Sequence, residues 1–402
     1  MSDDTIQNPH PVYAELRQQP VFYSERIGMW VVSRYADVAE ILRDRGVRFH
    51  KDEFLPVYEM TAEATRILAE GFDRVPTFDT NPPEHRRIRS FTSKIFTPAR
   101  MRTMEPRIRA IAGELIEGFA ADGRCEFVEQ FAFQLPAMVA FDFLGVPREA
   151  ADRVRDWSVS YVELFWDFCP PERQVQAARD NVAYWQYIGS LIRERRAEPR
   201  DDVFSILIQA DGADGEPLTD SEIISICHHL VIAGHRTTTN NLASMMIHLL
   251  QDRSRWERVT ADPALAAGAV EESLRMDAPV TALWYRTAAE VSFEGTTIPA
   301  GERVLVVYGS ANHDESVYEA PEKYELDRPN ANRHLAFGLG PHVCAGAPLA
   351  RVIAPVAVQE LARRLPNLRM PAQDIRYLPL WTSRGPEAVH LEWDLPANGT
   401  GA

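Results

Sequence analysis

The spacing of apolar and polar residues predicts a chain built mainly of helices, with a few short strands. Helical spacing covers residues 36–43 and residues 100–119. Residues 30–35 have the composition of a short strand, and residues 291–308, with the turn Pro299-Ala300-Gly301 inside them, are expected to form β structure. The pattern as a whole predicts a mainly α fold with small β-sheets.

The longest helix is expected in the middle of the chain. Thr219-Asp220-Ser221-Glu222 has the order of a capping box, in which the threonine and glutamate satisfy each other's backbone N–H groups. An apolar segment follows and runs to Leu250, which makes about 30 helical residues against a mean of about 11 or 12. A helix of this length predicts that other parts of the protein or a bound group lie along it.

Composition indicates one large domain. The chain has 402 residues, of which 45% are hydrophobic, and it contains no Gly/Ser linker, internal repeat or low-complexity tract. We expect an N-terminal tail at residues 1–10, a single domain at residues 11–394 and a flexible C-terminal tail at residues 395–402. The formal net charge of -15 argues against a nucleic-acid partner.

Cysteine usage and hydropathy predict a cytoplasmic protein without a membrane anchor. Cys125, Cys169, Cys227 and Cys344 lie far apart with no C-x-x-C pair, which argues against a disulfide framework and against structural zinc. The first residues are polar and acidic, without the pattern of a signal peptide. No apolar run reaches the length of about 18 residues that a membrane helix needs.

The segment at residues 337–351 carries the most informative chemistry. Cys344 lies in a glycine-rich loop, and an Ala/Leu/Val-rich segment follows it directly. A helix that begins just after Cys344 would point free N–H groups and the positive end of its dipole at the sulfur, which favours the thiolate. A thiolate held in this way is a soft axial ligand for haem iron. The alternative is a buried structural cysteine in a helix-capping turn.

The whole spaced pattern resembles the haem-binding signature of the cytochrome P450 family. The residues that match are Phe337, Gly338, Gly340, His342, Cys344, Gly346, Leu349, Ala350 and Arg351. The resemblance implies a cytochrome P450 fold in which haem b (iron protoporphyrin IX) lies between the long central helix and the helix after the cysteine. It also implies that Cys344 binds the iron and that Phe337, Gly338, His342 and Gly346 contact the cofactor.

The middle of the central helix, residues 233–238, resembles the family's oxygen-activation motif. Ala233 and Thr237 are four residues apart and share a helix face, so a small residue and a hydroxyl would form a groove for dioxygen. Thr237 could instead hydrogen-bond to the carbonyl four residues earlier. On the resemblance, we assign catalytic positions to Ala233, Arg236 and Thr237.

Arg236 departs from the family pattern, in which an acidic residue before the threonine helps to deliver protons. Arginine stays protonated at physiological pH and cannot relay a proton in the same way. Protons could arrive through water and Thr237, the substrate could supply its own acidic group, or the reaction could be non-standard, such as oxidative coupling of aromatic rings. Arg236 could also simply reach solvent or form an ion pair.

Four basic residues match positions at which the family binds the haem propionates, which need cationic partners when buried. His85 and Arg89 belong to the segment at residues 81–89, where Asn81 replaces the usual aspartate. Arg286 follows the Glu-x-x-Arg segment described next, and His334 precedes the cysteine loop. Basic residues on a surface are usually only solvated, so these roles rest on the resemblance.

Glu272 and Arg275 form a Glu-x-x-Arg pair on a helical segment. Alone, such a pair is a common surface ion pair worth a few tenths of a kcal/mol. The resemblance implies that it is buried and joined by Arg328, forming a triad with a structural role beneath the haem.

Aromatic residues around the expected substrate pocket favour a planar or aromatic substrate. His229 lies one turn before Ala233 and should look into the same pocket. Any one of these side chains could instead pack in the core. The other expected pocket residues are Phe165, Trp166, Val280, Leu283, Trp284 and Trp381.

The resemblance implies a monooxygenase that uses dioxygen to oxidise an organic small molecule, an aromatic compound or a natural-product intermediate. Electrons are expected from a separate ferredoxin and its NAD(P)H-dependent ferredoxin reductase, and the protein is expected to be a monomer. Arg236 keeps open oxidative coupling or a peroxide-driven oxidation. A haem-binding sensor without turnover is the third alternative, against which the Ala233 and Thr237 groove argues.

Overall fold

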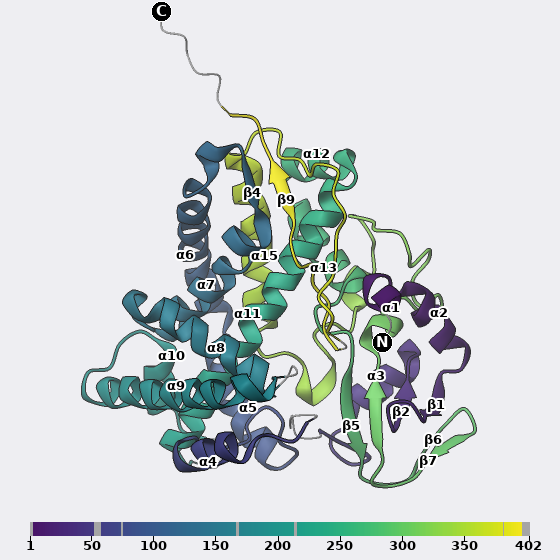
Figure 1. Cartoon of the computed structure of the whole chain (residues 1–402). Coiled ribbons are helices and arrows are strands. Elements are labelled where there is room, and N and C mark those ends of the chain that lie inside the picture. Colours follow the sequence, from purple (N-terminus) through teal and green to yellow (C-terminus); the bar gives the residue numbers. More distant parts are fainter. Residues whose placement is uncertain are drawn as a thin grey trace, which may run out of the picture.

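Helices make up most of the computed structural model, which describes residues 3–51, 58–73, 75–165, 169–212, 215–380 and 382–395 (Figure 1). The helices are α1 (Asp3–Gln7), α2 (His10–Gln18), α3 (Tyr35–Arg43), α4 (Ala62–Gly71), α5 (Glu84–Ile95), α6 (Pro98–Glu117), α7 (Gln134–Leu144), α8 (Ala151–Phe165), α9 (Pro171–Ala197), α10 (Val203–Gln209), α11 (Asp220–Leu250), α12 (Arg253–Ala261), α13 (Leu265–Met276), α14 (Tyr308–Ala311) and α15 (Ala347–Arg364).

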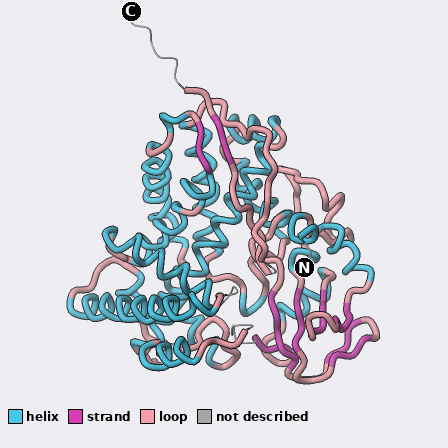
Figure 2. Tube along the Cα trace, in the orientation of Figure 1, coloured by secondary structure: helices cyan, strands magenta, loops and turns pink. Residues whose placement is uncertain are grey.

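Short strands gather mainly at one side of the molecule, away from the helical body (Figure 2). One sheet has five strands in the order β1-β2-β8-β5-β3, and two further sheets pair β4 with β9 and β6 with β7. Among the strand pairs of the described residues, only β2 and β8 run parallel. The strands are β1 (Val21–Ser24), β2 (Met29–Val32), β3 (Phe49–Lys51), β4 (Arg124–Glu126), β5 (Leu283–Thr287), β6 (Val291–Phe293), β7 (Thr296–Ile298), β8 (Arg303–Val306) and β9 (His390–Glu392). The predicted fold class, mainly α with small sheets, is confirmed.

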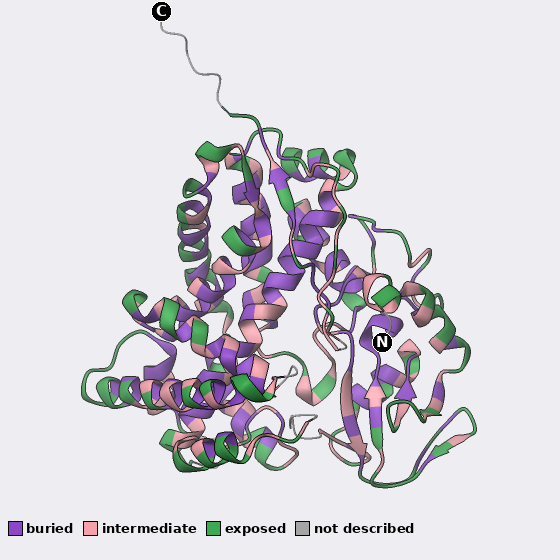
Figure 3. Cartoon of the chain, in the orientation of Figure 1, coloured by how far each residue is buried: buried purple, intermediate pink, exposed green. Residues whose placement is uncertain are grey.

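The central helix α11 forms as the capping box predicts. The Thr219 hydroxyl accepts the Glu222 N–H at 3.2 Å, and the Glu222 carboxylate accepts the Thr219 N–H at 2.8 Å. The helix then runs for 31 residues and packs against α7, α9, α13 and α15. It is buried along much of its length because other helices surround it (Figure 3).

The other predicted elements are confirmed in outline, with changes at their ends. Residues 36–43 and 100–119 lie in α3 and α6, and residues 291–308 contain β6, β7 and β8. The strand predicted at residues 30–35 ends at Val32 as β2. Tyr35 instead begins α3, because its N–H donates to the Asp314 carboxylate at 2.8 Å and this bond caps the helix start.

Part of the N-terminal tail predicted at residues 1–10 is helical and contacts the rest of the chain. Residues from Asp3 form helix α1, and Arg384 donates to the Ile6 carbonyl oxygen at 2.8 Å. Gln7 donates through its side chain to the Tyr377 carbonyl oxygen at 3.2 Å. These bonds tie the segment to the body of the protein. Residues 396–402 of the predicted C-terminal tail lie outside the described residues.

Among the residues that the structure describes, no helix combines the length and the apolar character needed to cross a bilayer. All four cysteines are free thiols, as their spacing predicts. Cys125, Cys169 and Cys227 are buried, and burial raises the pKa of each thiol. They therefore behave as packing residues.

Candidate functional site

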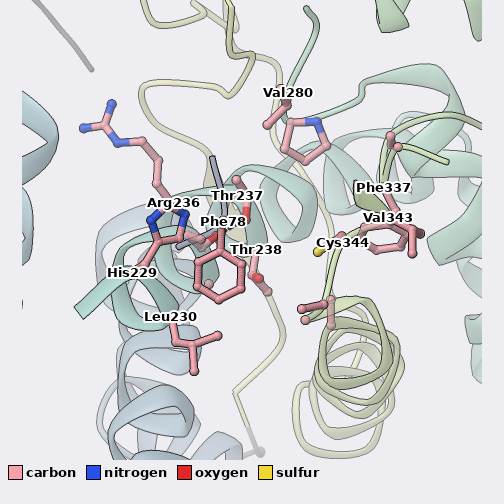
Figure 4. A pocket seen from close by; sticks show the side chains of 18 of the residues that line it. Phe78, His229, Leu230, Arg236, Thr237, Thr238, Val280, Phe337, Val343 and Cys344 are labelled. Carbon is pink, nitrogen blue, oxygen red and sulfur yellow. Dashed lines mark hydrogen bonds between the residues drawn. The ribbon is translucent and has the colours of Figure 1, made fainter. Parts of the chain in front are cut away.

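A cavity of about 360 Å³ lies between α11 and the loop that carries Cys344 (Figure 4). Its wall is mainly apolar, as is usual for a site that binds an organic ligand. The predicted site residues that line it are His85, Arg89, Phe165, His229, Ala233, Arg236, Thr237, Val280, Leu283, Trp284, Phe337, Gly338, His342, Cys344 and Gly346.

Glycines allow the cysteine loop to turn tightly. Gly338 and Gly340 have φ angles of +68° and +69°, which side-chain-bearing residues rarely adopt. A Cβ atom at Gly340 would also collide with the Leu42 carbonyl oxygen, so this position needs glycine for space as well. The Cys344 N–H donates to the Phe337 carbonyl oxygen at 2.8 Å and closes the loop.

The Cys344 sulfur faces the cavity, on the side toward Thr237 and Thr238 of α11 (Figure 4). The thiol is accessible from within the cavity although protein surrounds it. Burial raises the pKa of the thiol, whereas the N–H groups of Gly346 and Ala347 at the start of α15 lower it. The predicted helix start after the cysteine is confirmed, and burial affects the pKa of the thiol more strongly than the N–H groups of the helix start do.

Lys51, His85, Arg89 and His342 form a basic cluster in the cavity wall beside the cysteine loop. The two histidine rings lie with their centroids 3.9 Å apart. Burial lowers the pKa of His85 to about 4 and that of His342 to about 3, and the charges of Arg89 and Lys51 act in the same direction. Among the described residues, the buried His85 Nδ1 has no hydrogen-bond partner. The basic cluster therefore offers neutral and charged donors to a bound anion.

Lys51 is the member of the basic cluster that sequence reasoning missed. It lies at the end of β3, opposite Tyr285 of β5, and its ammonium lies 4.2 Å from the Tyr285 ring centroid. The Asn81 side chain accepts the Lys51 N–H at 2.8 Å and donates to the Lys51 carbonyl oxygen at 3.1 Å. Asn81, the departure from the family pattern, thus fixes Lys51 in place.

Arg286 and His334 are not among the cavity-lining residues, unlike the other two basic residues predicted with them. Arg286 donates to the Gly301 carbonyl oxygen at 2.8 Å. His334 lies 3.3 Å from the carboxylate of Glu271, which also binds Arg351 at 2.7 Å and 2.9 Å. Burial opposes the ionisation of Glu271, yet these two partners lower its pKa to about 2. The nearest charged group to His334 is therefore a carboxylate that Arg351 already binds.

A groove opens on α11 where Ala233 and Thr237 face the cavity. A Cβ atom at Gly234 would meet no heavy atom within 4 Å, so the helix surface is open there. The Thr237 hydroxyl donates to the Ala233 carbonyl oxygen at 2.7 Å, which is the back-bonded arrangement. The guanidinium of Arg236 points away from Cys344 (Figure 4).

The predicted triad is formed in the interior. The Glu272 carboxylate accepts two bonds from Arg275, at 2.7 Å and 2.8 Å, and one from Arg328 at 2.9 Å. The three side chains are at most 2% exposed. Both arginines also donate to backbone carbonyl oxygens, including that of Lys323. The triad is therefore fully hydrogen-bonded and joins α13 to the segment before the cysteine loop.

Aromatic rings line the part of the cavity farther from Cys344. His229 packs on Phe78, with ring centroids 4.7 Å apart, and Phe165 lies 4.7 Å from the Tyr161 ring. Phe78 is a second residue that the sequence did not indicate. Two predicted pocket residues, Trp166 and Trp381, lie outside the described residues.

Comparison with known proteins finds relatives along nearly the whole chain. The family model described as Cytochrome P450 matches residues 5–375. Cytochrome P450 107B1 of Saccharopolyspora erythraea is 35% identical over 384 residues, which cover 93% of this chain and 92% of that protein. Cytochrome P450 monooxygenase PikC of Streptomyces venezuelae is 33% identical over 405 residues, which cover 98% of this chain and 93% of that protein. Cytochrome P450 CREJ in complex with (4-ethylphenyl) dihydrogen phosphate has a similar structure, with a TM-score of 0.90 and 32% identity over 97% of this chain and 98% of that one.

Proposed function

The chain belongs to the cytochrome P450 family, and we propose that it uses haem b, bound through Cys344, to insert one oxygen atom of dioxygen into an organic small molecule. The observation that carries the proposal is the Cys344 sulfur facing an apolar cavity across from the Thr237 groove. As a member of this family, the protein is a haem-iron oxidoreductase.

The residues around the cavity fit a haem. Cys344 supplies the soft sulfur ligand, and the basic cluster supplies donors for two propionates, including the buried His85 Nδ1 that has no partner among the described residues. When bound, thiolate-ligated haem iron supplies the means to activate dioxygen, because the thiolate pushes electron density that favours O–O cleavage. Phe337, Gly338 and Gly346 form the wall against which the flat cofactor would lie.

Thr237, on the cavity wall across from Cys344, is the group that holds and moves a proton. Its hydroxyl is bonded to the Ala233 carbonyl oxygen, and rotation of the side chain would turn the hydroxyl into the groove. Arg236 cannot release a proton at neutral pH, so the proton at Thr237 Oγ1 must be replaced from water that enters the cavity. The apolar wall excludes other water and thereby keeps oxidation directed at the substrate.

The substrate proposed is an aromatic compound or a natural-product intermediate. Aromatic side chains such as Phe78, Phe165 and Trp284 offer flat contact surfaces in the cavity. The CREJ structure with an aryl phosphate shows that a relative with the same fold binds an aromatic ligand.

We propose that electrons come from a ferredoxin and its NAD(P)H-dependent ferredoxin reductase. We also propose that the protein is a monomer in the cytoplasm. The family match assigns residues 5–375 to a cytochrome P450 domain. The free thiols agree with a reducing compartment.

Turnover with isotopically labelled dioxygen tests the proposal. With NAD(P)H, a ferredoxin and its reductase, the product should carry one labelled oxygen atom. Oxidative coupling is the second candidate, favoured by Arg236 in place of an acid, and it would give a coupled product without label. Turnover with NAD(P)H alone would contradict the proposed partners.

A further inference from the structure

One face of the central helix α11 carries polar side chains although other helices surround it. Four polar residues follow one another along this face, at intervals of four, three and four residues. They are Thr237, Asn241, Ser244 and His248, and we call them the polar row. Thr237 and Asn241 line the cavity. The polar row therefore leads from the Thr237 groove along α11 toward the last turn of the helix.

Two buried atoms in the middle of the polar row have no hydrogen-bond partner in the part of the chain that the structure describes. They are Asn241 Oδ1 and Ser244 Oγ. Asn241 is 4% exposed and Ser244 is 0% exposed. Buried polar groups are nearly always hydrogen-bonded, and a buried water molecule is the usual partner where the protein offers none. The polar row is therefore suited to bind water.

The polar row ends at a contact between α11 and α13, which pack against each other (Figure 1). His248 Nε2 lies 2.7 Å from the Asp277 carboxylate, which also accepts a bond from Arg384 at 2.6 Å. The side chain of His248 is 12% exposed, whereas that of Asp277 is 3% exposed. Because histidine is the side chain that exchanges protons near neutral pH, His248 is the member of the polar row that can take up a proton from solvent.

We propose that the polar row binds a chain of water molecules that carries protons from His248 to Thr237. The inference rests on the proposed function, because it names the route by which the proton at Thr237 Oγ1 is replaced. Successive members of the row lie one helical turn apart, with Cβ atoms separated by about 5–6 Å. One water molecule spans such a gap with two hydrogen bonds of about 2.7–2.8 Å each.

The members of the polar row have different parts in this route. Each water molecule and the Ser244 hydroxyl accept one proton and release another, so every proton that leaves Thr237 is matched by one that His248 takes from solvent. The Asn241 amide does not relay protons, and its oxygen accepts a hydrogen bond that holds a water molecule in position. Asn241 is therefore a positioning residue.

A matched pair of variants at Ser244 tests the route in the holoprotein. Valine and threonine have nearly the same shape, but only threonine keeps the hydroxyl. The protein is immobilised on a rotating ring-disk electrode, which supplies the electrons, and dioxygen is the probe. Reduction to water consumes four protons and four electrons, and reduction to hydrogen peroxide consumes two of each. Ser244→Val should raise the ratio of peroxide to water about 10-fold over Ser244→Thr, because positioned proton transfer contributes at least this much to a rate.

A second variant and a control separate the route from general damage to the helix. Asn241→Leu removes the amide oxygen at similar volume and should raise the same ratio. Ser225→Ala removes another buried hydroxyl of α11, which accepts the Val75 N–H at 2.9 Å, and should keep the wild-type ratio.

A high-resolution crystal structure of the holoprotein tests the route without turnover. Ordered water should lie within hydrogen-bond distance of Asn241 Oδ1 and Ser244 Oγ, and Ser244→Val should lack the water at position 244. The inference is overturned if the wild type binds no water there, or if Ser244→Val and Ser244→Thr give equal ratios of peroxide to water. Failure of the proposed function would show separately, as a missing thiolate signature in the carbon monoxide spectrum of the wild type.

Discussion

Replacing Glu272 by glutamine should destabilise the protein more than any substitution of a surface carboxylate. The Glu272 carboxylate is the shared acceptor for Arg275 and Arg328 and also accepts the Glu325 N–H at 3.0 Å. Glutamine has nearly the same shape but carries no charge. Arg275 would then remain in the interior without its counter-ion, and Arg328 would keep only the ion pair with the half-exposed Glu325.

The magnitude follows from the burial of the triad. The side chains of Glu272 and Arg275 are 0% exposed and that of Arg328 is 2% exposed. Removing one partner of a buried ion pair costs about 3–5 kcal/mol, because the remaining charge is shielded from water and no longer has a counter-ion. Glu325 offers a matched control, since it pairs with the same Arg328 at 3.1 Å but is 48% exposed. Glu325→Gln should cost at most about 1 kcal/mol.

Urea unfolding of the holoprotein, followed by far-ultraviolet circular dichroism, measures both variants. Glu272→Gln should lower the free energy of unfolding by several times the effect of Glu325→Gln. It should also reduce the fraction of protein that retains the cofactor, because the triad anchors the segment before the cysteine loop. Equal and small effects of the two substitutions would refute the argument that burial makes this triad structural.

Three further predictions concern the loop, the pH dependence and the proton path. Gly340→Ala should strongly destabilise the holoprotein in urea, because a Cβ atom at this position collides with the Leu42 carbonyl oxygen. Gly301 also has a positive φ, of +87°, but lies in open space, so Gly301→Ala should cost only about 1–2 kcal/mol. Equal costs of the two substitutions would contradict the steric argument. Burial lowers the pKa of the His235 side chain from 6.5 to about 4. Between these two pH values the unfolded chain therefore binds a proton on His235 and the folded chain does not. Stability should therefore fall from about pH 6.5 to about pH 4, and urea titrations of His235→Gln should show a shallower fall; an unchanged slope would exclude this histidine as the cause. Thr237→Ala should raise the NAD(P)H consumed per molecule of product without weakening substrate binding, and Thr237→Ser should restore the wild-type ratio; poor coupling in the serine variant would show that the hydroxyl is not what matters.

Local patterns allowed the cysteine loop and the central helix to be predicted. The loop residues lie within one short segment, and the capping box of α11 involves residues three apart, so both depend on neighbours in the sequence. Lys51 could not be predicted, because only the pairing of β3 with β5 brings it to the cavity.

The direction of a side chain is a second property that the sequence did not provide. His334 has the residue type expected of a propionate ligand, yet it is not among the cavity-lining residues, and its Nε2 atom lies 3.3 Å from the Glu271 carboxylate. The family pattern also could not indicate where the guanidinium of Arg236 points. Both outcomes depend on charged groups that are distant in the sequence or on the shape of the cavity.

The carbon monoxide spectrum of the reduced protein tests the central claim most directly. If the Cys344 thiolate binds the haem iron, the wild-type adduct absorbs at the red-shifted position characteristic of thiolate ligation, and Cys344→Ala loses this band. Cys125→Ala and Cys169→Ala remove buried thiols elsewhere and should retain it. A band that persists in Cys344→Ala would contradict the account.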